Sequence, residues 1–457
     1  MPRMSIPRLS TLMAILALGS GCSDESPSDG SPGSGGGTAE EPTPEPPAPD
    51  PLGLEDCSAL DASLPSAHDL PVASWTNADE HAVMCQLRVL DAVLASRSII
   101  CLGENDHGVS ESSRYHTLLA RYLVHQLGVR TISLETTYAS AATWSGFIQT
   151  GDVGLLDAGF GDAQGSLANT RELQALIESL SAVAAELPPG ETLTIDGFDI
   201  AVQPTMTRAA VLDFLLVAAP EEHDAWAAAL VGLTAQADFE VAANAADDLI
   251  LELESNQDAY IAATDEASMT AALINAENLR DGYRFLAYYF AGDFWTGNAT
   301  FREPGMIRNL ERLRATLPED EPLVVIAHNA HCAQSLTIGT TVDGDPSPAF
   351  GTHLATKLGD GYATVAQLYM EGDHLTLAQG SISAQPFAAS SASLEAAIGE
   401  TVSADALLVG TWNDGVTTPL VPLDQEWLIQ GPYEQVPAAQ HDVLLWLRSV
   451  TASTLRD

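Results

Sequence analysis

Four short apolar runs in this sequence each end in an acidic residue or a histidine. The runs cover 98–102, 130–134, 192–195 and 323–327, and their aliphatic and β-branched residues are typical of buried strands. The polar residues that follow these runs are Glu104, His107, Glu135, Asp199, His328 and His331. A helical pattern separates the first two runs, so this part of the chain has the length of a βαβ unit. Because ligand crevices in parallel α/β sheets lie beyond the carboxyl ends of the strands, we expect these side chains to converge at one edge of a sheet.

The predicted fold class is therefore α/β, with a mainly parallel sheet flanked by helices. Residues 361–369 are expected to form a further strand. From about 203 to 298 the sequence is rich in Ala, Leu, Asp and Glu, and its apolar residues follow a helical period. The helices expected there cover 209–219, 224–235, 239–253 and 267–291. We interpret this segment as a helical subdomain, or lid, inserted between two halves of the sheet.

The first 21 residues are typical of a secretory signal. They begin with Arg3 and Arg8, continue with a short apolar run and end with small residues before Cys22. A cysteine at this position resembles the bacterial lipobox, in which the cysteine is lipidated and becomes the mature N-terminus. Residues 22–52 then combine this lipid-anchor cysteine with a linker of Pro, Gly, Ser and acidic residues, which is too polar to fold. We expect a folded domain over 53–457 that is lipid-anchored outside the cytoplasm, at the outer membrane or in the periplasm, with ordinary secretion as the alternative.

The charge of the chain argues against nucleic-acid partners. The chain has 18 Lys and Arg against 62 Asp and Glu, a net charge of −44, so it lacks the basic surface that neutralises the phosphates of nucleic acids.

Cys57 and Cys85 lie near each other in the N-terminal part of the domain, and in an oxidising compartment we expect them to form a disulfide. Cys101 and Cys332 end apolar runs and are interpreted as buried small hydrophobic residues, with a second disulfide as the open alternative.

An ordered set of short motifs from about residue 95 to 450 resembles the erythromycin esterase-like family. The motifs are Gly103-Glu104-x-x-His107-Gly108, Glu111, Arg121-Tyr-Leu-Val, Leu127-Gly128, Leu134-Glu135, Gly197-Phe-Asp199, Arg302-x-x-x-Met306-x-x-Asn309, His328-Asn-x-His331 and Phe350-Gly-x-x-Leu354. Hydrolysis of a macrolide lactone gives this family its name. The resemblance therefore implies that residues 53–457 form a catalytic domain that hydrolyses a small-molecule ester or lactone without a cofactor, and we expect a monomer.

The resemblance also implies roles for individual residues. His107 is expected to be the general base that activates water, with Glu104 and Glu135 orienting or supporting it. The expected site is completed by Arg302, His328 and His331. Family members tend to carry a basic residue nine positions after the motif histidine, where this chain has His116, with Arg114 two residues earlier. These two residues and Asp199 are expected to contact the substrate.

The chemistry of the residues leaves other functions open. There is no Gly-x-Ser-x-Gly motif, so the sequence gives no support to a serine nucleophile. A metal or haem-iron binding protein, or a metal-dependent hydrolase, is the main alternative, with ligands from Glu104, His107, Glu135, His328 and His331. The sequence has no His-Glu-x-x-His pair to favour it. The third possible function is that of a surface binding protein built on a degenerate enzyme fold. The histidines that we interpret as surface or satisfied core residues are His68, His81, His125, His223, His353, His374 and His441.

Overall fold

A computed structural model describes most of the domain. The described residues are 52, 57, 78–163, 166–200, 202–231, 236–378, 381–389, 394–400, 403, 405–409, 421–423, 433–435 and 441–456. The expected signal segment, Cys22 and the linker up to residue 51 lie outside them. No helix within the described ranges combines the length and the apolar character needed to cross a membrane.

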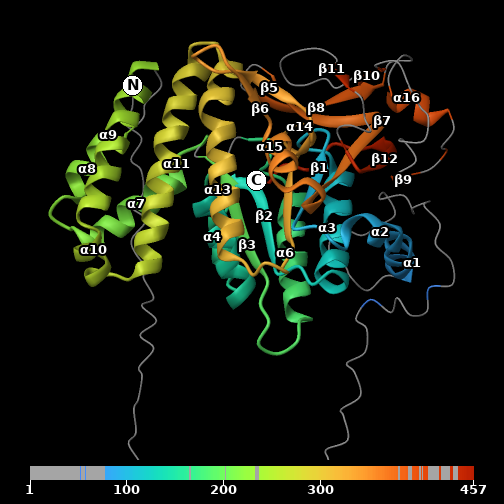
Figure 1. The fold of residues 1–457 in the computed structure, drawn as a ribbon, viewed down its shortest axis with the longest axis horizontal. Helices are drawn as coiled ribbons and strands as arrows, with labels where there is room; N and C mark the ends of the chain where they lie inside the picture. The colour runs from blue at the N-terminus through green and yellow to red at the C-terminus, as the bar shows by residue number, and fades with distance from the viewer. Residues whose placement is uncertain are drawn as a thin grey trace, which may run out of the picture. The chain divides into compact units, whose positions relative to one another are not determined.

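An eight-stranded, mainly parallel sheet organises the domain, which confirms the predicted fold class (Figure 1). In spatial order its main path consists of β3 (Thr194–Asp199), β2 (Thr131–Thr137), β4 (Leu323–His328), β1 (Ile99–Glu104), β7 (Tyr362–Ala378), β12 (Val443–Val450) and β9 (Ala406–Val409). All these strands pair in parallel except β9, which is antiparallel to β12. The strand expected at 361–369 is longer than predicted because β7 continues into an antiparallel pair with β8 (Ser381–Ala388).

The apolar runs are continuous because the central strands are covered on both faces. Alternate residues of β1 show this: Ile100 and Leu102 belong to the core beneath α3 (Ser110–Gln126), α4 (Tyr138–Thr150) and α6 (Arg171–Ala185). Ile99 and Cys101 face the opposite core beneath α13 (Glu303–Thr316) and α15 (Phe350–Leu358). The side chains at the carboxyl ends of the strands are therefore held by a rigid frame.

The segment between β3 and β4 is helical and has a hydrophobic core of its own (Figure 1). Its helices are α7 (Thr205–Ala218), α8 (His223–Ala229), α9 (Gln236–Ser255), α10 (Gln257–Ala263), α11 (Glu266–Phe290) and α12 (Phe294–Gly297). Helices predicted at 209–219, 239–253 and 267–291 correspond to α7, α9 and α11. The helix predicted at 224–235 is shorter, since α8 ends at Ala229. A π-helical turn, Asn298–Arg302, then leads into α13.

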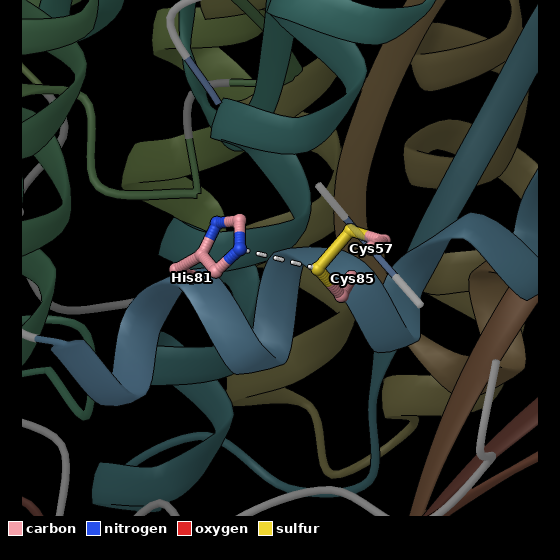
Figure 2. A group of neighbouring side chains, drawn as sticks. All are labelled: Cys57, His81 and Cys85. Carbon is pink, nitrogen blue, oxygen red and sulfur yellow. Dashed lines mark hydrogen bonds between the residues drawn. A yellow bond between two sulfur atoms is a disulfide. The ribbon is translucent and has the colours of Figure 1, made fainter. Parts of the chain in front are cut away.

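Disulfides join all four cysteines of the described residues. Cys57 and Cys85 are bonded, with their Cα atoms 5.5 Å apart, and Cys85 lies on α1 (Ala78–Leu87) (Figure 2). Cys101 and Cys332 are buried, as expected, but they are also bonded, so the alternative of a second disulfide is the correct one. The reason lies in the strand order: β4 pairs with β1, and α14 (Asn329–Cys332), which follows β4, brings Cys332 back over Cys101.

Candidate active site

The loop after β1 presents a hydrogen-bonded carboxylate and imidazole at the carboxyl edge of the sheet. Nδ1 of His107 lies 2.6 Å from Oε1 of Glu104, the last residue of the strand. Gly108 permits the tight turn before α3, because its φ of +82° is unfavourable for other residues and a Cβ there would lie 2.6 Å from Leu375. Since a carboxylate only accepts hydrogen bonds, Nδ1 of His107 carries a proton. Nε2, on the other side of the ring, lies 4.0 Å from Oε1 of Glu135.

Arg302 joins the ends of two neighbouring strands. Its Nη2 donates to Glu135 Oε1 at 2.6 Å and to Asp199 Oδ2 at 2.8 Å, and its Nε donates to Asp199 Oδ1 at 3.0 Å. Glu135 lies on β2 and Asp199 ends β3, whereas Arg302 ends the π-helical turn after the helical segment. The other oxygen of Glu135 accepts the backbone N–H of His328 at 2.8 Å. The side chains predicted to converge from β2, β3 and β4 are thus brought together.

His331 lies behind this arginine, in contact with a glutamate that sequence reasoning missed. Its Nε2 is 3.3 Å from Nη1 of Arg302 and 3.6 Å from Oε1 of Glu135, and its Nδ1 forms an ion pair with Glu303. Glu303 is fully buried and also accepts the backbone N–H of Phe350. Its position directly after Arg302 was the available signal, but a glutamate in the first turn of a helix ordinarily indicates only a favourable interaction with the helix dipole.

A second acidic residue of the β1 loop also has a buried partner that we did not predict as part of the site. Asp106 pairs with Nδ1 of His374, on the extension of β7, and the same nitrogen lies 3.0 Å from the hydroxyl of Tyr369. His374 is buried, as expected of a satisfied core histidine. Burial raises the pKa of Asp106, although His374 and His107 oppose the shift. This pair anchors the loop that carries His107.

The buried charges of the cluster compensate one another. Burial disfavours the charged form of Glu135, but His331, Arg302 and His107 outweigh it and hold the pKa of its carboxyl well below the usual range. Burial likewise disfavours a charged His331, but Glu303 and Glu135 raise the pKa of its imidazole. The inner part of the site therefore pairs an ionised Glu135 with Arg302 and with the imidazolium of His331, while Glu303 contacts the far side of His331 and Asp199 contacts Arg302.

The two histidines nearest the strand ends differ in ionisation. Burial opposes protonation of His107, but the charges of Glu104, Glu135 and Asp106 overcome it and raise the pKa of His107 to about 9. Burial lowers the pKa of His328 well below its ordinary value, and the nearby His107 adds to this effect. Their rings meet edge to face, with centroids 5.7 Å apart, and Nδ1 of His328 accepts the backbone N–H of Ala330.

A cavity of about 800 Å³ opens in front of the cluster. The predicted site residues that line it are Glu104, His107, His116, Glu135, Asp199 and Arg302. His328, His331 and Arg114 are absent from the described lining, so the expectation that Arg114 contacts the substrate has no support from the cavity. His116 is buried, and its Nε2 is 3.0 Å from the carbonyl oxygen of Gly103. This contact directs the ring toward the strand that carries Glu104.

The remaining walls of the cavity are largely apolar. The helical segment contributes an aromatic and aliphatic wall, formed by Phe239, Phe285, Leu286, Tyr289, Phe290 and Phe294. Arg208 on α7 also lines the cavity and forms no ion pair with a carboxylate of the described residues. The cavity can therefore hold a molecule with a large apolar surface and bring one polar bond of it to Nε2 of His107.

The side chains of the cavity do not form a metal site within the described residues. Within the described ranges, the one group of His, Cys, Asp or Glu side chains whose ligand atoms all lie within 4.8 Å of one another is Cys57, His81 and Cys85, on the N-terminal side of the domain. In the cavity, the guanidinium of Arg302 occupies the point at which Glu135 and Asp199 converge. The carboxylates that a metal would need there already bind a cation.

Comparison with known proteins identifies a family by its sequence model and a fold by solved structures. A family model described as erythromycin esterase matches residues 124–450, a range that begins within α3, after Glu104 and His107. A histidine-to-asparagine mutant of the erythromycin esterase EreC in its open conformation has a similar fold, with a TM-score of 0.63 and 18% identity over 81% of this chain and 95% of that one.

Two further solved structures share the fold. A Bacillus cereus protein gives a TM-score of 0.68 with 17% identity over 87% of this chain and 96% of its own. A succinoglycan biosynthesis protein gives 0.65 with 17% identity, covering 88% of this chain and 98% of its own. No curated protein sequence matches the chain.

Proposed function

The chain belongs to the erythromycin esterase family, and we propose that it is a hydrolase that cleaves an ester or lactone with water activated by His107. The observation that carries the proposal is the position of this imidazole. Among the predicted site histidines, His107 both lines the cavity and pairs through Nδ1 with a carboxylate, and its Nε2, 4.0 Å from Oε1 of Glu135, is the proposed base. Membership of the family supports a hydrolase, and the ester or lactone specificity and the role of His107 are the proposed parts.

The proposed first step is addition of water to the carbonyl carbon. Nε2 of His107 takes a proton from the water as its oxygen bonds to the carbonyl carbon, and the electron pair of the carbonyl bond moves to oxygen. Glu104 stabilises the imidazolium that forms. When the tetrahedral intermediate collapses, the bond to the leaving oxygen breaks, and His107 returns the proton to that oxygen. The products are a carboxylic acid and an alcohol, or a hydroxy acid from a lactone.

Arg302 is the proposed source of positive charge for the oxyanion. A guanidinium has five N–H donors, and the carboxylates of Glu135 and Asp199 account for three of them, one on Nε and two on Nη2. The N–H groups of Nη1, which lies 3.3 Å from Nε2 of His331, are the proposed donors to the oxyanion. A positioned donor of this kind typically contributes about 10²- to 10³-fold in rate.

We propose a small-molecule ester or lactone as the substrate, and a monomeric enzyme that is attached to a membrane through lipid on Cys22, in the cell envelope. The support for the anchor is the signal-like segment and the polar linker of the sequence. The apolar cavity wall supports a substrate with substantial hydrophobic surface.

A panel of esters and lactones tests the proposal, with purified protein and the variant His107→Ala. We expect hydrolysis of at least one compound and a loss of about 10²- to 10⁴-fold in kcat for the variant. His223→Ala is the matched control, because His223 starts a helix that has no buried residue, and its ion pair within the described part of the chain is with the adjacent Asp224.

Dialysis against a chelator separates this mechanism from the metal-dependent alternative. We expect an unchanged rate. Loss of activity that a divalent ion restores would instead assign the same residues as metal ligands, and near-normal turnover by His107→Ala would show that another group is the base.

A further inference from the structure

The disulfide between Cys57 and Cys85 has a histidine against one of its sulfurs (Figure 2). His81 and Cys85 lie four residues apart on α1, on the same face of the helix. Nε2 of His81 is 3.6 Å from Sγ of Cys85. The group lies before residue 124, outside the range that the family model matches, and none of the three residues lines the active-site cavity.

The hydrogen-bond partner of the other ring nitrogen of His81 bears on how the imidazole interacts with Sγ of Cys85. Nδ1 lies 3.2 Å from the carbonyl oxygen of Leu52, which only accepts hydrogen bonds. A disulfide sulfur is also only an acceptor. Both neighbours of the ring are acceptors, so an N–H group at Nε2 is directed at the sulfur of Cys85.

The two sulfurs differ in their exposure. Cys57 packs against the hydrophobic core but is partly exposed, whereas Cys85 is buried, with 8% of its surface exposed. An incoming thiolate therefore reaches Cys57 more easily than Cys85. The second disulfide is protected, because Cys101 and Cys332 are both fully buried.

We propose that this disulfide is a thiol-exchange site, at which a small-molecule thiolate attacks Cys57 and Cys85 leaves as a thiolate paired with His81. The attacking sulfur forms a bond to Sγ of Cys57 as the bond between Cys57 and Cys85 breaks, and its electron pair goes to Sγ of Cys85. The products are a mixed disulfide on Cys57 and one free thiolate, so the exchange needs no other oxidant or reductant. His81 accelerates the step because stabilising the leaving thiolate makes it leave faster.

Exchange with glutathione tests the proposal on the full chain, without denaturant. Free thiols are alkylated at timed intervals, and peptides are mapped by mass spectrometry. We expect glutathione on Cys57 and the alkyl group on Cys85, with Cys101 and Cys332 unmodified. Glutathione found equally on Cys85, or earlier reaction of Cys101 and Cys332, overturns the proposal.

The variant His81→Ala tests the role of the histidine. Removing the N–H donor beside the leaving sulfur should slow the exchange by roughly tenfold. His223→Ala, on another exposed helix, should react at the normal rate. An unchanged rate for His81→Ala refutes acceleration by the imidazole. If this variant does not fold, the position of glutathione in the unaltered protein, on Cys57 or on Cys85, still shows which sulfur the thiolate attacks.

Discussion

Replacing Glu104 by glutamine should make the pH profile of hydrolysis cross that of the unaltered enzyme. Burial lowers the pKa of His107, and Glu104 is the strongest of the charges that overcome burial and raise it to about 9. The side-chain oxygen of glutamine still accepts the proton of Nδ1, now 2.6 Å from the carboxylate, so the variant removes the charge and keeps the hydrogen bond.

The size of the effect follows from ionisation and base strength. With a pKa of about 9, about 1% of His107 is in the neutral form at pH 7. Loss of an adjacent opposite charge lowers such a pKa by about 1 to 3, and a value near 7.5 would make about a quarter of the imidazole neutral at pH 7. A weaker base also reacts more slowly, by about sixfold for a Brønsted coefficient near 0.5. The variant should therefore be about fourfold faster at pH 7 and about sixfold slower above pH 10.

The assay is kcat/KM against pH for a confirmed substrate, because this quantity reports ionisations of the free enzyme. The activity of the unaltered enzyme should rise with pH until about 9, and the rising limb of Glu104→Gln should lie at least one pH unit lower. Glu240→Gln is a control on an exposed helical position. A rising limb at the same pH in both enzymes would refute His107 as the group that must lose a proton.

Four further outcomes are expected. Cys22→Ser should move the protein from the membrane to the soluble fraction after cell fractionation, and unchanged membrane association would contradict a lipid anchor. Arg302→Gln should lower the free energy of unfolding in urea by about 3 to 5 kcal/mol, because the two carboxylates that it joins stay buried without their cation. Asp196→Asn should raise the melting temperature at pH 7 but not at pH 4, since burial raises the pKa of this carboxyl to about 6 and its ionisation then costs stability as the pH rises from about 4 through 6. Arg208→Gln should raise KM by roughly tenfold for an anionic ester and leave KM unchanged for its neutral analogue, as measured by steady-state kinetics.

The convergence of side chains could be predicted best for residues at the end of a strand. Glu104, Asp199 and His328 are the last residues of β1, β3 and β4, and Glu135 lies near the end of β2. Parallel pairing brings such positions to one edge whatever the strand order is, so the convergence could be predicted. The helices between β3 and β4 could also be predicted, because the helical spacing of their apolar residues is visible within each segment and does not depend on the strand order.

The contacts that were missed depend on which strands are neighbours. Cys101 meets Cys332 because β4 lies next to β1, and His374 reaches Asp106 because β7 lies on the other side of β1 and extends beyond it. No local pattern encodes this order. Glu303 was missed for a different reason: its buried partner, His331, is supplied by a separate helical turn after β4.

The position of Arg302 also limits how the cavity can open. The π-helical turn that ends in this arginine follows the aromatic wall directly, and π-helical turns frequently occur at functional sites. Its side chain is 14% exposed, and those of Glu135 and Asp199 are 7% and 9% exposed. Moving this end of the helical segment away from the sheet would break a buried charge pair, at a cost of about 3 to 5 kcal/mol. The remote end of the helical segment, α8 to α10, has no such anchor to the cluster among the described residues, so we expect any opening for substrate to occur there and to leave Arg302 in place.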